Sequence, residues 1–332
     1  MTTPPTHMQA VIGGSLGGPE HYGLVNVPIP ALGPEDVQIR ISVSGMGYVD
    51  GLVSRGLYQV KPDVPYCPGL EFAGTVNSVG DQVTNLAIGD QVAVSAFGGG
   101  LAEYAVVPAK NAVKIPATFD VRAAAGFIVN YTTAHHGLLD RGQLQPEDIV
   151  LVLGAAGGTG IAAIQIARMA GARVIAGAST QVKRDYALQH GATDSIDYTQ
   201  PDWRKTLKAM TNGHGVDVVF DPVGGDLMEP AFRSLAWRGR HLVVGFVGGP
   251  IPALPINLAL LKGSALIGVD YRQFGSVYEQ EQSVRVREAL FEAVESGVLN
   301  PPIGTSFALA EYAAAMDLAA SRDGLGKTIV ET

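Results

Sequence analysis

The feature that most restricts the fold of this chain is a glycine-rich turn between a buried strand and an apolar helix. The run Ile149–Leu153 is wholly apolar, the turn GAAGGTG follows at Gly154–Gly160, and Ile161–Ala167 continues as a helix. No charge interrupts residues 149–167, so the stretch is also long enough to cross a bilayer. Glycines in its middle disfavour a spanning helix and supply the conformations of a tight turn. The sequence therefore predicts a strand–turn–helix unit.

Buried strands alternate with helices through the middle of the chain. Further apolar runs follow the first strand, and helical patterns separate most of them. The predicted strands are 149–153, 173–176, 195–197, 216–220, 241–244 and 265–269. Alternating units of this kind build a doubly wound parallel sheet, so we predict an α/β Rossmann domain over residues 126–269.

The segments on either side have a different pattern. Residues 1–125 consist of short apolar or alternating runs punctuated by Gly and Pro, which is typical of a β-rich domain. Helices are predicted at 283–295 and 309–321, and a final strand at 327–330. A chain of 332 residues suits two domains, so we expect the segment 270–332 to return to the first domain and complete it.

The charge balance argues against a nucleic-acid partner. The formal net charge is -8, the isoelectric point is near 5.3, and no run of Lys or Arg is present. The first residues lack the basic and apolar regions of a secretion signal. We therefore expect a cytoplasmic protein that binds a small molecule and neither nucleic acid nor membrane.

Cys67 is the only cysteine of the chain. A single cysteine excludes an intrachain disulfide and any structural zinc site built from several cysteines. We interpret Cys67 as a small buried residue beside Pro68.

The spacing of the glycine turn predicts a dinucleotide cofactor. Gly157 allows the backbone to approach a pyrophosphate, and Gly160 allows the helix to pack closely on the strand. The helix N-terminus adds free N–H groups and the positive end of a dipole. Ala155 stands where the general G-x-G-x-x-G pattern has its first glycine. The predicted cofactor-binding residues of this turn are Ala156, Gly157, Gly158, Thr159 and Gly160.

The end of the second predicted strand favours NADPH over NADH. A carboxylate at this point accepts the ribose 2′-hydroxyl of NAD, whereas a 2′-phosphate needs cations and hydroxyl groups. The sequence here, AGASTQ at 176–181, contains no acid, and Ser179 offers a hydroxyl. Lys183 and Arg184 follow within one helical turn. The alternative is that both cations belong to a solvated helix face.

Several segments together resemble the medium-chain dehydrogenase/reductase superfamily, in its zinc-independent quinone oxidoreductase branch. The resemblance covers nearly the whole chain, and the order and spacing of the segments make it specific. They are GMGYVD at 45–50, RGLY at 55–58, YCPGLEFAGTV at 66–76, the turn at 154–160, GVDVVFDPVGG at 215–225 and GFVGG at 245–249. The resemblance implies a first domain shaped like the partly open β-barrel of the GroES fold, and a homodimer.

The resemblance also implies that no metal is bound. Zinc-dependent members carry a Cys in the segment that matches 45–50 and a His directly before the Glu of the segment that matches 69–74. This chain has no cysteine in the first segment, and Leu70 precedes Glu71 in the second. Without this Lewis acid, oxidation of alcohols is not expected. We interpret Glu71 as structural.

Metal-free chemistry in this branch is hydride delivery to an electron-poor carbon. The resemblance implies an NADPH-dependent oxidoreductase acting on a quinone or on an activated alkene, that is, an α,β-unsaturated carbonyl. Tyr58 aligns with a tyrosine that resembles a general acid in related enoyl reductases. It is equally interpretable as a loop aromatic that lines an apolar pocket, and quinone reduction needs no protein acid.

Two other functions stay open at this point. A 2-enoyl-thioester reductase, acting on enoyl-CoA or acyl carrier substrates, would need a basic patch, for which Arg55 and Lys61 lie near the relevant segment. A non-catalytic NADPH-binding protein would keep the fold without turnover. The intact glycine turn argues against the second alternative.

The resemblance assigns further cofactor contacts by position. Thr133 matches a residue near the nicotinamide amide, and Tyr198 matches a tyrosine that reaches the 2′-phosphate beside Lys183. Phe246 and Val247 follow a strand end and are expected to line the nicotinamide side.

Four more positions complete the expectations. Lys327 is expected to approach the cofactor from the C-terminal segment, and Gly47 replaces an asparagine that is common in the family. His135 and His136 form a tempting pair, but without partner ligands nearby we expect them to have packing or surface roles.

Overall fold

The computed structural model describes residues 5–332, which fall into two compact units. The first unit runs up to Val129 and includes Pro302–Thr332, and the second is Asn130–Pro301. The predicted return segment therefore begins at 302, not at 270. Residues 270–301 belong to the second unit. Phe274 of this segment stacks on His136 of the second unit, with ring centroids 3.9 Å apart.

The first unit is built mainly of antiparallel strands. Its described elements are β1 (His7–Gly13), β2 (Tyr22–Pro28), β3 (Asp36–Met46), α1 (Tyr48–Ser54), β4 (Glu71–Val79), β5 (Gln91–Ser95), β6 (Tyr104–Pro108), β7 (Ala112–Lys114), α2 (Val121–Ala124), β14 (Ile303–Ala308), α11 (Tyr312–Ala320) and β15 (Lys327–Glu331). Strands β1 and β2 pair with each other, and the main sheet has the order β14-β15-β3-β4-β5-β7, with β6 also paired to β3.

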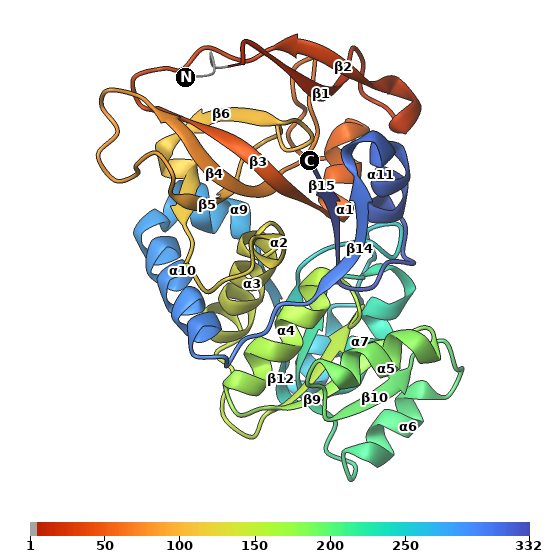
Figure 1. The fold of residues 1–332 in the computed structure, drawn as a ribbon. Coiled ribbons are helices and arrows are strands. Elements are labelled where there is room, and N and C mark those ends of the chain that lie inside the picture. Colours follow the sequence, from red (N-terminus) through yellow and green to blue (C-terminus); the bar gives the residue numbers. More distant parts are fainter. Residues whose placement is uncertain (1–4) are drawn as a thin grey trace. The chain divides into compact units, whose positions relative to one another are not determined.

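Strand β3 is the centre of this sheet. Val37, Ile39 and Ile41 alternate with more exposed residues and bury their side chains in one apolar core. The C-terminal strand β15 pairs antiparallel with β3, although the two lie at opposite ends of the sequence (Figure 1). This pairing explains why the last residues complete the first unit, as the sequence predicted.

The second unit contains a parallel sheet with helices between its strands. Its described elements are α3 (Ile128–His135, which begins in the first unit), η3 (His136–Arg141), β8 (Ile149–Leu153), α4 (Gly158–Met169), β9 (Arg173–Ala178), α5 (Gln181–Gln189), β10 (Asp194–Asp197), α6 (Trp203–Met210), β11 (Val216–Asp221), α7 (Met228–Arg233), β12 (Leu235–Val243), α8 (Asn257–Lys262), β13 (Ala265–Gly268), α9 (Tyr271–Gln273), η5 (Phe274–Tyr278) and α10 (Gln280–Glu295).

The strand order of this sheet locates a ligand crevice. The order is β10-β9-β8-β11-β12-β13, and all neighbours are parallel. The chain therefore moves outward in one direction from β8 to β10, and then in the other from β11 to β13. Ligands of open α/β sheets bind at the carboxyl ends of the strands where the order reverses, which here is between β8 and β11. The predicted doubly wound Rossmann architecture is confirmed.

Some predicted boundaries were wrong. β12 begins at Leu235, six residues before the predicted start, because its first half is interrupted by the polar residues around Arg238, whose φ is 63°. A local backbone irregularity here breaks the period on which the prediction rested.

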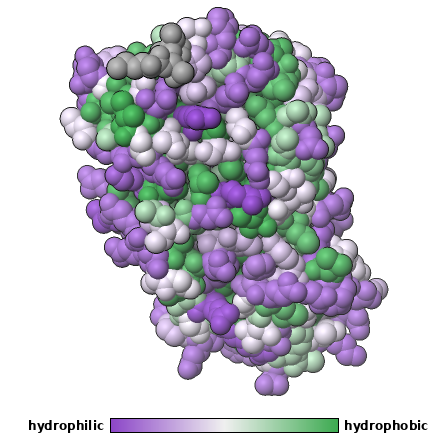
Figure 2. Space-filling view, in the orientation of Figure 1, coloured by the Kyte–Doolittle hydropathy of each residue, from purple (hydrophilic) through white to green (hydrophobic). Residues whose placement is uncertain are grey.

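Within residues 5–332, no helix has the length and apolar character needed to span a bilayer. The apolar stretch 149–167 is divided between β8, the turn and α4, as the glycines predicted. Figure 2 shows hydrophilic and hydrophobic residues mixed over the visible face.

Candidate functional site

The glycine turn follows β8 at the point where the strand order reverses. Gly154 has a φ of 59°, a left-handed conformation that favours glycine, and α4 begins at Gly158. A Cβ atom on Gly160 would lie 2.3 Å from the carbonyl oxygen of Gly154. No side chain fits there, so the predicted close packing of helix on strand is the reason for this glycine.

Close packing within the protein does not explain why residue 157 is a glycine. A Cβ atom there would meet only the Gly154 carbonyl oxygen, at 3.6 Å, which is ordinary contact. The first N–H groups of α4 have no partner within the helix and point out of its N-terminus. The open space above Gly157 and these donors fit a pyrophosphate that approaches the backbone.

Asn130, which lies on α3, contacts the glycine turn, and this role was not predicted from the sequence. The Thr159 hydroxyl donates to Oδ1 of Asn130 over 2.8 Å, and a Cβ on Gly158 would lie 2.8 Å from Nδ2 of Asn130. α3 is itself tied to α4, because the Tyr131 hydroxyl donates to Oε1 of Gln165 over 2.9 Å. Asn130 is only 7% exposed. A buried amide in an apolar helix is the signal that points to this role.

Thr133 lies one helical turn after Asn130 on the same face of α3. Its side chain is 9% exposed. The predicted position of Thr133 near the nicotinamide amide stays a prediction. His136, three residues further, is paired with Asp140 through Nδ1 and Oδ2 at 3.1 Å and stacked on Phe274, which agrees with a packing role.

The end of β9 brings together the residues predicted to distinguish NADPH from NADH. β9 ends at Ala178, Ser179 follows, and Thr180 caps α5 by accepting from the backbone N–H of Lys183. Tyr198 directly follows the neighbouring strand β10, and its ring lies 3.3 Å from the position of a Cβ on Gly177. Ser179 and Tyr198 therefore follow the paired carboxyl ends of β9 and β10, and Lys183 lies in the first turn of α5.

Arg184 has a structural role that the sequence did not show. Its guanidinium donates to the Ala178 carbonyl oxygen over 3.2 Å and pairs with Asp197 at 3.0 Å. Asp197 brings a carboxylate near the end of β9, although β9 itself carries none. A hydrogen bond from the Thr199 hydroxyl is the main reason that the pKa of Asp197 lies below its usual value, and Arg184 contributes.

The other wall of the crevice follows β11 and β12. Phe246 is 38% exposed and packs over Gly224, where a Cβ would lie 2.9 Å from Cδ1 of Phe246. The Val247 N–H donates to the Pro222 carbonyl oxygen over 3.3 Å. A Cβ on Gly154 would lie 3.0 Å from Cγ2 of Val223. The structure therefore places Phe246 and Val247 on a loop that is connected to the glycine turn through residues 222–224.

In the first unit, Tyr58 lies after α1 and is partly buried. Its ring is tilted against Phe97, with centroids 6.3 Å apart, and it packs at the edge of an apolar cluster. The structure thus shows an aromatic packing role for the ring. Arg55 pairs with Asp317 at 3.8 Å and donates to the Gly51 carbonyl oxygen over 3.2 Å. This arginine is held within the unit by these contacts.

Lys327 is part of a buried charged cluster in the first unit. Its Nζ lies 2.6 Å from Oε2 of Glu71, whose Oε1 accepts from the Val129 N–H over 2.8 Å. Asp50 accepts from the backbone N–H groups of Gly47 and Leu70, each over 2.8 Å. Burial raises the pKa of Asp50, and the ammonium of Lys327 opposes this shift. Glu71 therefore ties β4, α3 and β15 together, in agreement with a structural role.

Gly47 leaves space beside this cluster. A Cβ there would lie 3.4 Å from Nζ of Lys327 and 3.8 Å from Oδ2 of Asp50. An asparagine side chain at this position would approach both groups. The lysine head group is consequently less covered here than it would be with a side chain at position 47.

Cys67 is half-buried, not fully buried as interpreted from the sequence, and burial raises the pKa of its thiol to about 12. The thiolate is the reactive form, so the native thiol at about pH 8 is expected to react on the order of a thousandfold more slowly than a free cysteine. The rate of modification by a thiol reagent, followed with and without denaturant, measures this. A rate in the native protein close to the denatured rate would contradict the predicted burial.

No group of three or more His, Cys, Asp or Glu residues with the geometry of a metal site occurs between residues 5 and 332. Glu71, the carboxylate next to Leu70, is engaged by Lys327.

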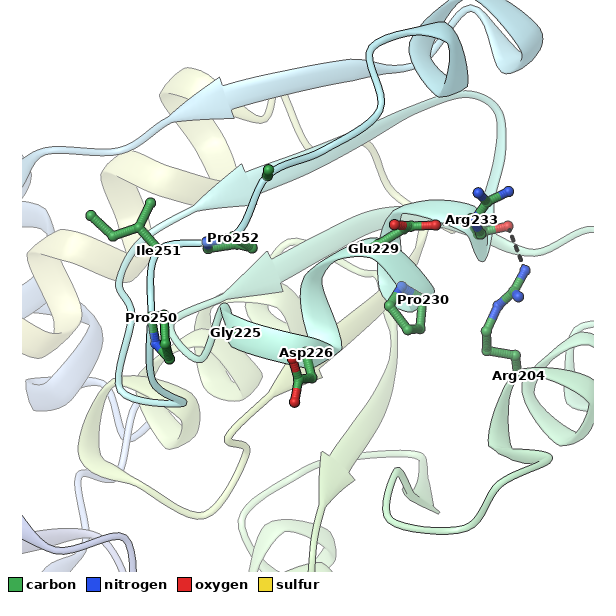
Figure 3. A pocket seen from close by; sticks show the side chains of 10 residues that line it. Arg204, Gly225, Asp226, Glu229, Pro230, Arg233, Pro250, Ile251 and Pro252 are labelled. Atoms are coloured by element: carbon green, nitrogen blue, oxygen red, sulfur yellow. Dashed lines mark hydrogen bonds and ion pairs between the residues drawn. The ribbon is translucent and has the colours of Figure 1, made fainter.

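A separate hollow of about 520 Å³ lies along α7. It is lined by Arg204, Gly225, Asp226, Glu229, Pro230, Arg233, Pro250, Ile251, Pro252 and Ala253. Figure 3 shows Arg204 directed at the backbone of Arg233, whose carbonyl oxygen accepts over 3.4 Å, and Arg233 also pairs with Glu229 at 2.7 Å. Both cations are engaged, and none of the predicted site residues lies in this hollow.

Known proteins share both units of this chain. The family described as alcohol dehydrogenase GroES-like domain matches residues 33–117, and the family described as zinc-binding dehydrogenase matches residues 158–285. The quinone oxidoreductase-like protein 2 homolog of Nematostella vectensis is 36% identical over 91% of this chain and 83% of its own length. The quinone oxidoreductase of Sus scrofa is 33% identical over 99% of both chains.

Solved structures agree with this. The Escherichia coli quinone oxidoreductase, whose crystal structure is a complex with NADPH, superimposes with a TM-score of 0.88 at 26% identity, over 98% of this chain and 100% of that one. These matches confirm the predicted GroES-like and Rossmann folds. The chain belongs to the medium-chain dehydrogenase/reductase superfamily, in its quinone oxidoreductase-like branch.

Proposed function

We propose that this protein is a zinc-independent reductase that transfers hydride from NADPH to a quinone or to an α,β-unsaturated carbonyl compound. The observation that carries the proposal is the arrangement after the paired strands β9 and β10: Ser179 follows β9, Lys183 lies in the first turn of α5, and Tyr198 follows β10. The nearby carboxylate of Asp197 pairs with Arg184. The NADPH complex of the Escherichia coli relative supports the same cofactor.

The residues of the second unit would hold the dinucleotide. The backbone around Gly157 and the N-terminus of α4 bind the pyrophosphate, and Lys183 with its neighbours binds the 2′-phosphate. Thr133, Phe246 and Val247 orient the nicotinamide. When bound, NADPH supplies the hydride, so the task of this chain is orientation and the exclusion of water.

The groups of the first unit would act on the product of hydride addition. A reduced quinone or enolate oxygen needs a hydrogen-bond donor and a proton. Tyr58 is the proposed donor for enones. Lys327, which Glu71 holds, is the proposed cofactor contact from the C-terminal segment. The engaged state of Arg55 gives no support to an enoyl-thioester substrate.

The proposal is tested by following nicotinamide absorbance with quinones, simple enones and enoyl-CoA thioesters. We expect NADPH oxidation with the first two classes, and a rate loss in Tyr58→Phe that is confined to enones. Tight NADPH binding without turnover of any compound would overturn the proposed activity and leave a binding protein. Fastest turnover of thioesters would favour the enoyl-thioester alternative.

Lys183→Ala is expected to raise the KM for NADPH roughly tenfold or more, because one charged hydrogen bond to the 2′-phosphate is lost. The KM for NADH, which has no 2′-phosphate, should not change. Lys208→Ala on α6 is the matched control for loss of an exposed lysine. Equal effects on the two cofactors would remove Lys183 from the 2′-phosphate site.

We also propose that two copies of this chain associate through β13. This strand ends the sheet, and its Leu266 is 48% exposed. Trp237, Leu260 and Leu261 are 71%, 81% and 67% exposed nearby in the unit. An exposed apolar edge strand is a template for pairing with a second copy. Light scattering should show a dimer that Leu266→Lys converts to a monomer, and a monomeric wild type would contradict this.

The cytoplasmic location of the protein stays a prediction.

A further inference from the structure

A buried histidine–aspartate pair joins the neighbouring strands β11 and β12, and the proposed function makes no use of it. Asp221 is 2% exposed and His241 is fully buried, with Nε2 2.9 Å from Oδ2 of Asp221. A carboxylate only accepts hydrogen bonds, so this geometry assigns the imidazole proton to Nε2. Nδ1 of His241 has no hydrogen-bond partner among residues 5–332. Among the described residues, Asp221 is therefore the hydrogen-bond partner of the His241 ring.

The second oxygen of Asp221 sets the shape of the turn that follows β11. Oδ1 accepts from the backbone N–H groups of Val223 and Gly224, each over 2.8 Å. Gly224 and Gly225 both have left-handed backbones, with φ values of 62° and 55°. Three donors in fixed directions hold the Asp221 carboxylate in one orientation. Two of these donors are backbone N–H groups of the turn, and the third is the imidazole of His241.

This turn holds both walls of the crevice. The carbonyl oxygen of Val223 accepts from the Gly248 N–H over 2.7 Å, and that of Pro222 accepts from Val247. On the opposite side, the Val223 side chain lies against Gly154 at the start of the glycine turn. A rotation of the Asp221 carboxylate would therefore be transmitted to the loop 245–248.

We propose that His241 is a positioning residue for hydride transfer. His241 holds the carboxylate of Asp221 in one orientation, and this carboxylate holds the backbone turn at residues 222–225. That turn then positions the loop of Phe246 and Val247 beside the nicotinamide. This inference rests on the proposed function, because it gives that loop its task. His241 touches neither cofactor nor substrate in this role. An apolar residue would fill the same buried space on β12 but would leave Asp221 without its third donor.

The test compares two replacements of His241 with a control. His241→Met fills the space without a donor, and His241→Gln keeps an N–H that can reach Asp221. His214→Gln is the control, because Nε2 of His214 also lies 2.9 Å from an aspartate, Asp217, but near the amino end of β11. Each variant is measured well below its own melting temperature, so that lost stability is separated from altered positioning.

We expect His241→Met to raise the dissociation constant for NADPH and to lower kcat, each by about tenfold, as for the loss of one hydrogen bond to a buried charge. His241→Gln should recover most of both, and His214→Gln should match the wild type. A lower melting temperature with wild-type binding and kcat in His241→Met would overturn the inference and leave a purely structural histidine.

Amide hydrogen exchange gives a readout that does not depend on NADPH. The amides of Val223, Gly224, Val247 and Gly248 should exchange faster in His241→Met than in the wild type or in His214→Gln. Unchanged exchange at these amides would overturn the inference even if the proposed activity holds. A wild type that binds no NADPH would contradict the proposed function, while faster exchange would still show the linkage. If His241→Met does not fold, His241→Leu is a second apolar replacement that lacks the donor to Asp221.

Discussion

Gly160→Ala is expected to abolish measurable NADPH binding and to destabilise the protein by about 3 kcal/mol or more. The added Cβ would lie 2.3 Å from the Gly154 carbonyl oxygen and 2.8 Å from the Ala155 Cα. Both atoms belong to the backbone and cannot rotate away, so α4 must move off β8. The N–H groups at the start of α4 then no longer converge on the turn. Urea unfolding and a fluorescence titration with NADPH measure the two effects.

Gly157→Ala is the matched control for this effect. Its φ of -79° suits alanine, and its Cβ would make only an ordinary 3.6 Å contact. We expect the free energy of unfolding to change by less than about 0.5 kcal/mol, as at other unstrained sites. NADPH binding should still weaken by roughly tenfold or more, because the new methyl group occupies the space of the pyrophosphate. Wild-type affinity in Gly157→Ala would contradict the assigned phosphate site.

Glu71→Gln is expected to destabilise the protein by about 3–5 kcal/mol, because it leaves a buried ammonium without its counter-charge. Glu71 and Lys327 are 4% and 12% exposed at their side chains, and their charged atoms lie 2.6 Å apart. Glutamine keeps the acceptor for the Val129 N–H, so the substitution isolates the charge. Urea unfolding near neutral pH measures the loss.

The double variant Glu71→Gln with Lys327→Met provides the control. Removal of both charges avoids the uncompensated ammonium, so the double variant should be more stable than Glu71→Gln alone. A cost below about 1 kcal/mol for Glu71→Gln would show that the pair behaves as an exposed ion pair. In that case Glu71 would not tie β4, α3 and β15 together as described.

Local patterns were enough to predict the second unit. β8 has the predicted bounds, Ile149–Leu153, because a continuous apolar run before a glycine turn has few other structures open to it. Alternation of strands and helices then determines a parallel sheet. β12 was harder, because Arg238 and Gly239 interrupt its apolar pattern although the strand continues through them. The place of β15 beside β3 was not predicted, since no local pattern encodes a pairing across most of the chain.

The candidate site could be predicted only where one segment supplies the chemistry. Gly160, Ser179 and Lys183 follow from their positions after strand ends. Asn130 was missed because its partner Thr159 is 29 residues away, and the pair Asp221–His241 because its members are 20 residues apart on two strands. Such contacts arise from the register of the sheet, which a single sequence does not specify.

The most direct test of the central claim is the ratio of kcat/KM for NADPH to that for NADH, measured with a quinone on protein that has been dialysed against a metal chelator. The account predicts undiminished quinone reduction after chelation and a preference for NADPH of at least about tenfold, from the charged contact at Lys183. A preference for NADH, or activity that disappears on chelation and returns with Zn²⁺, would contradict it.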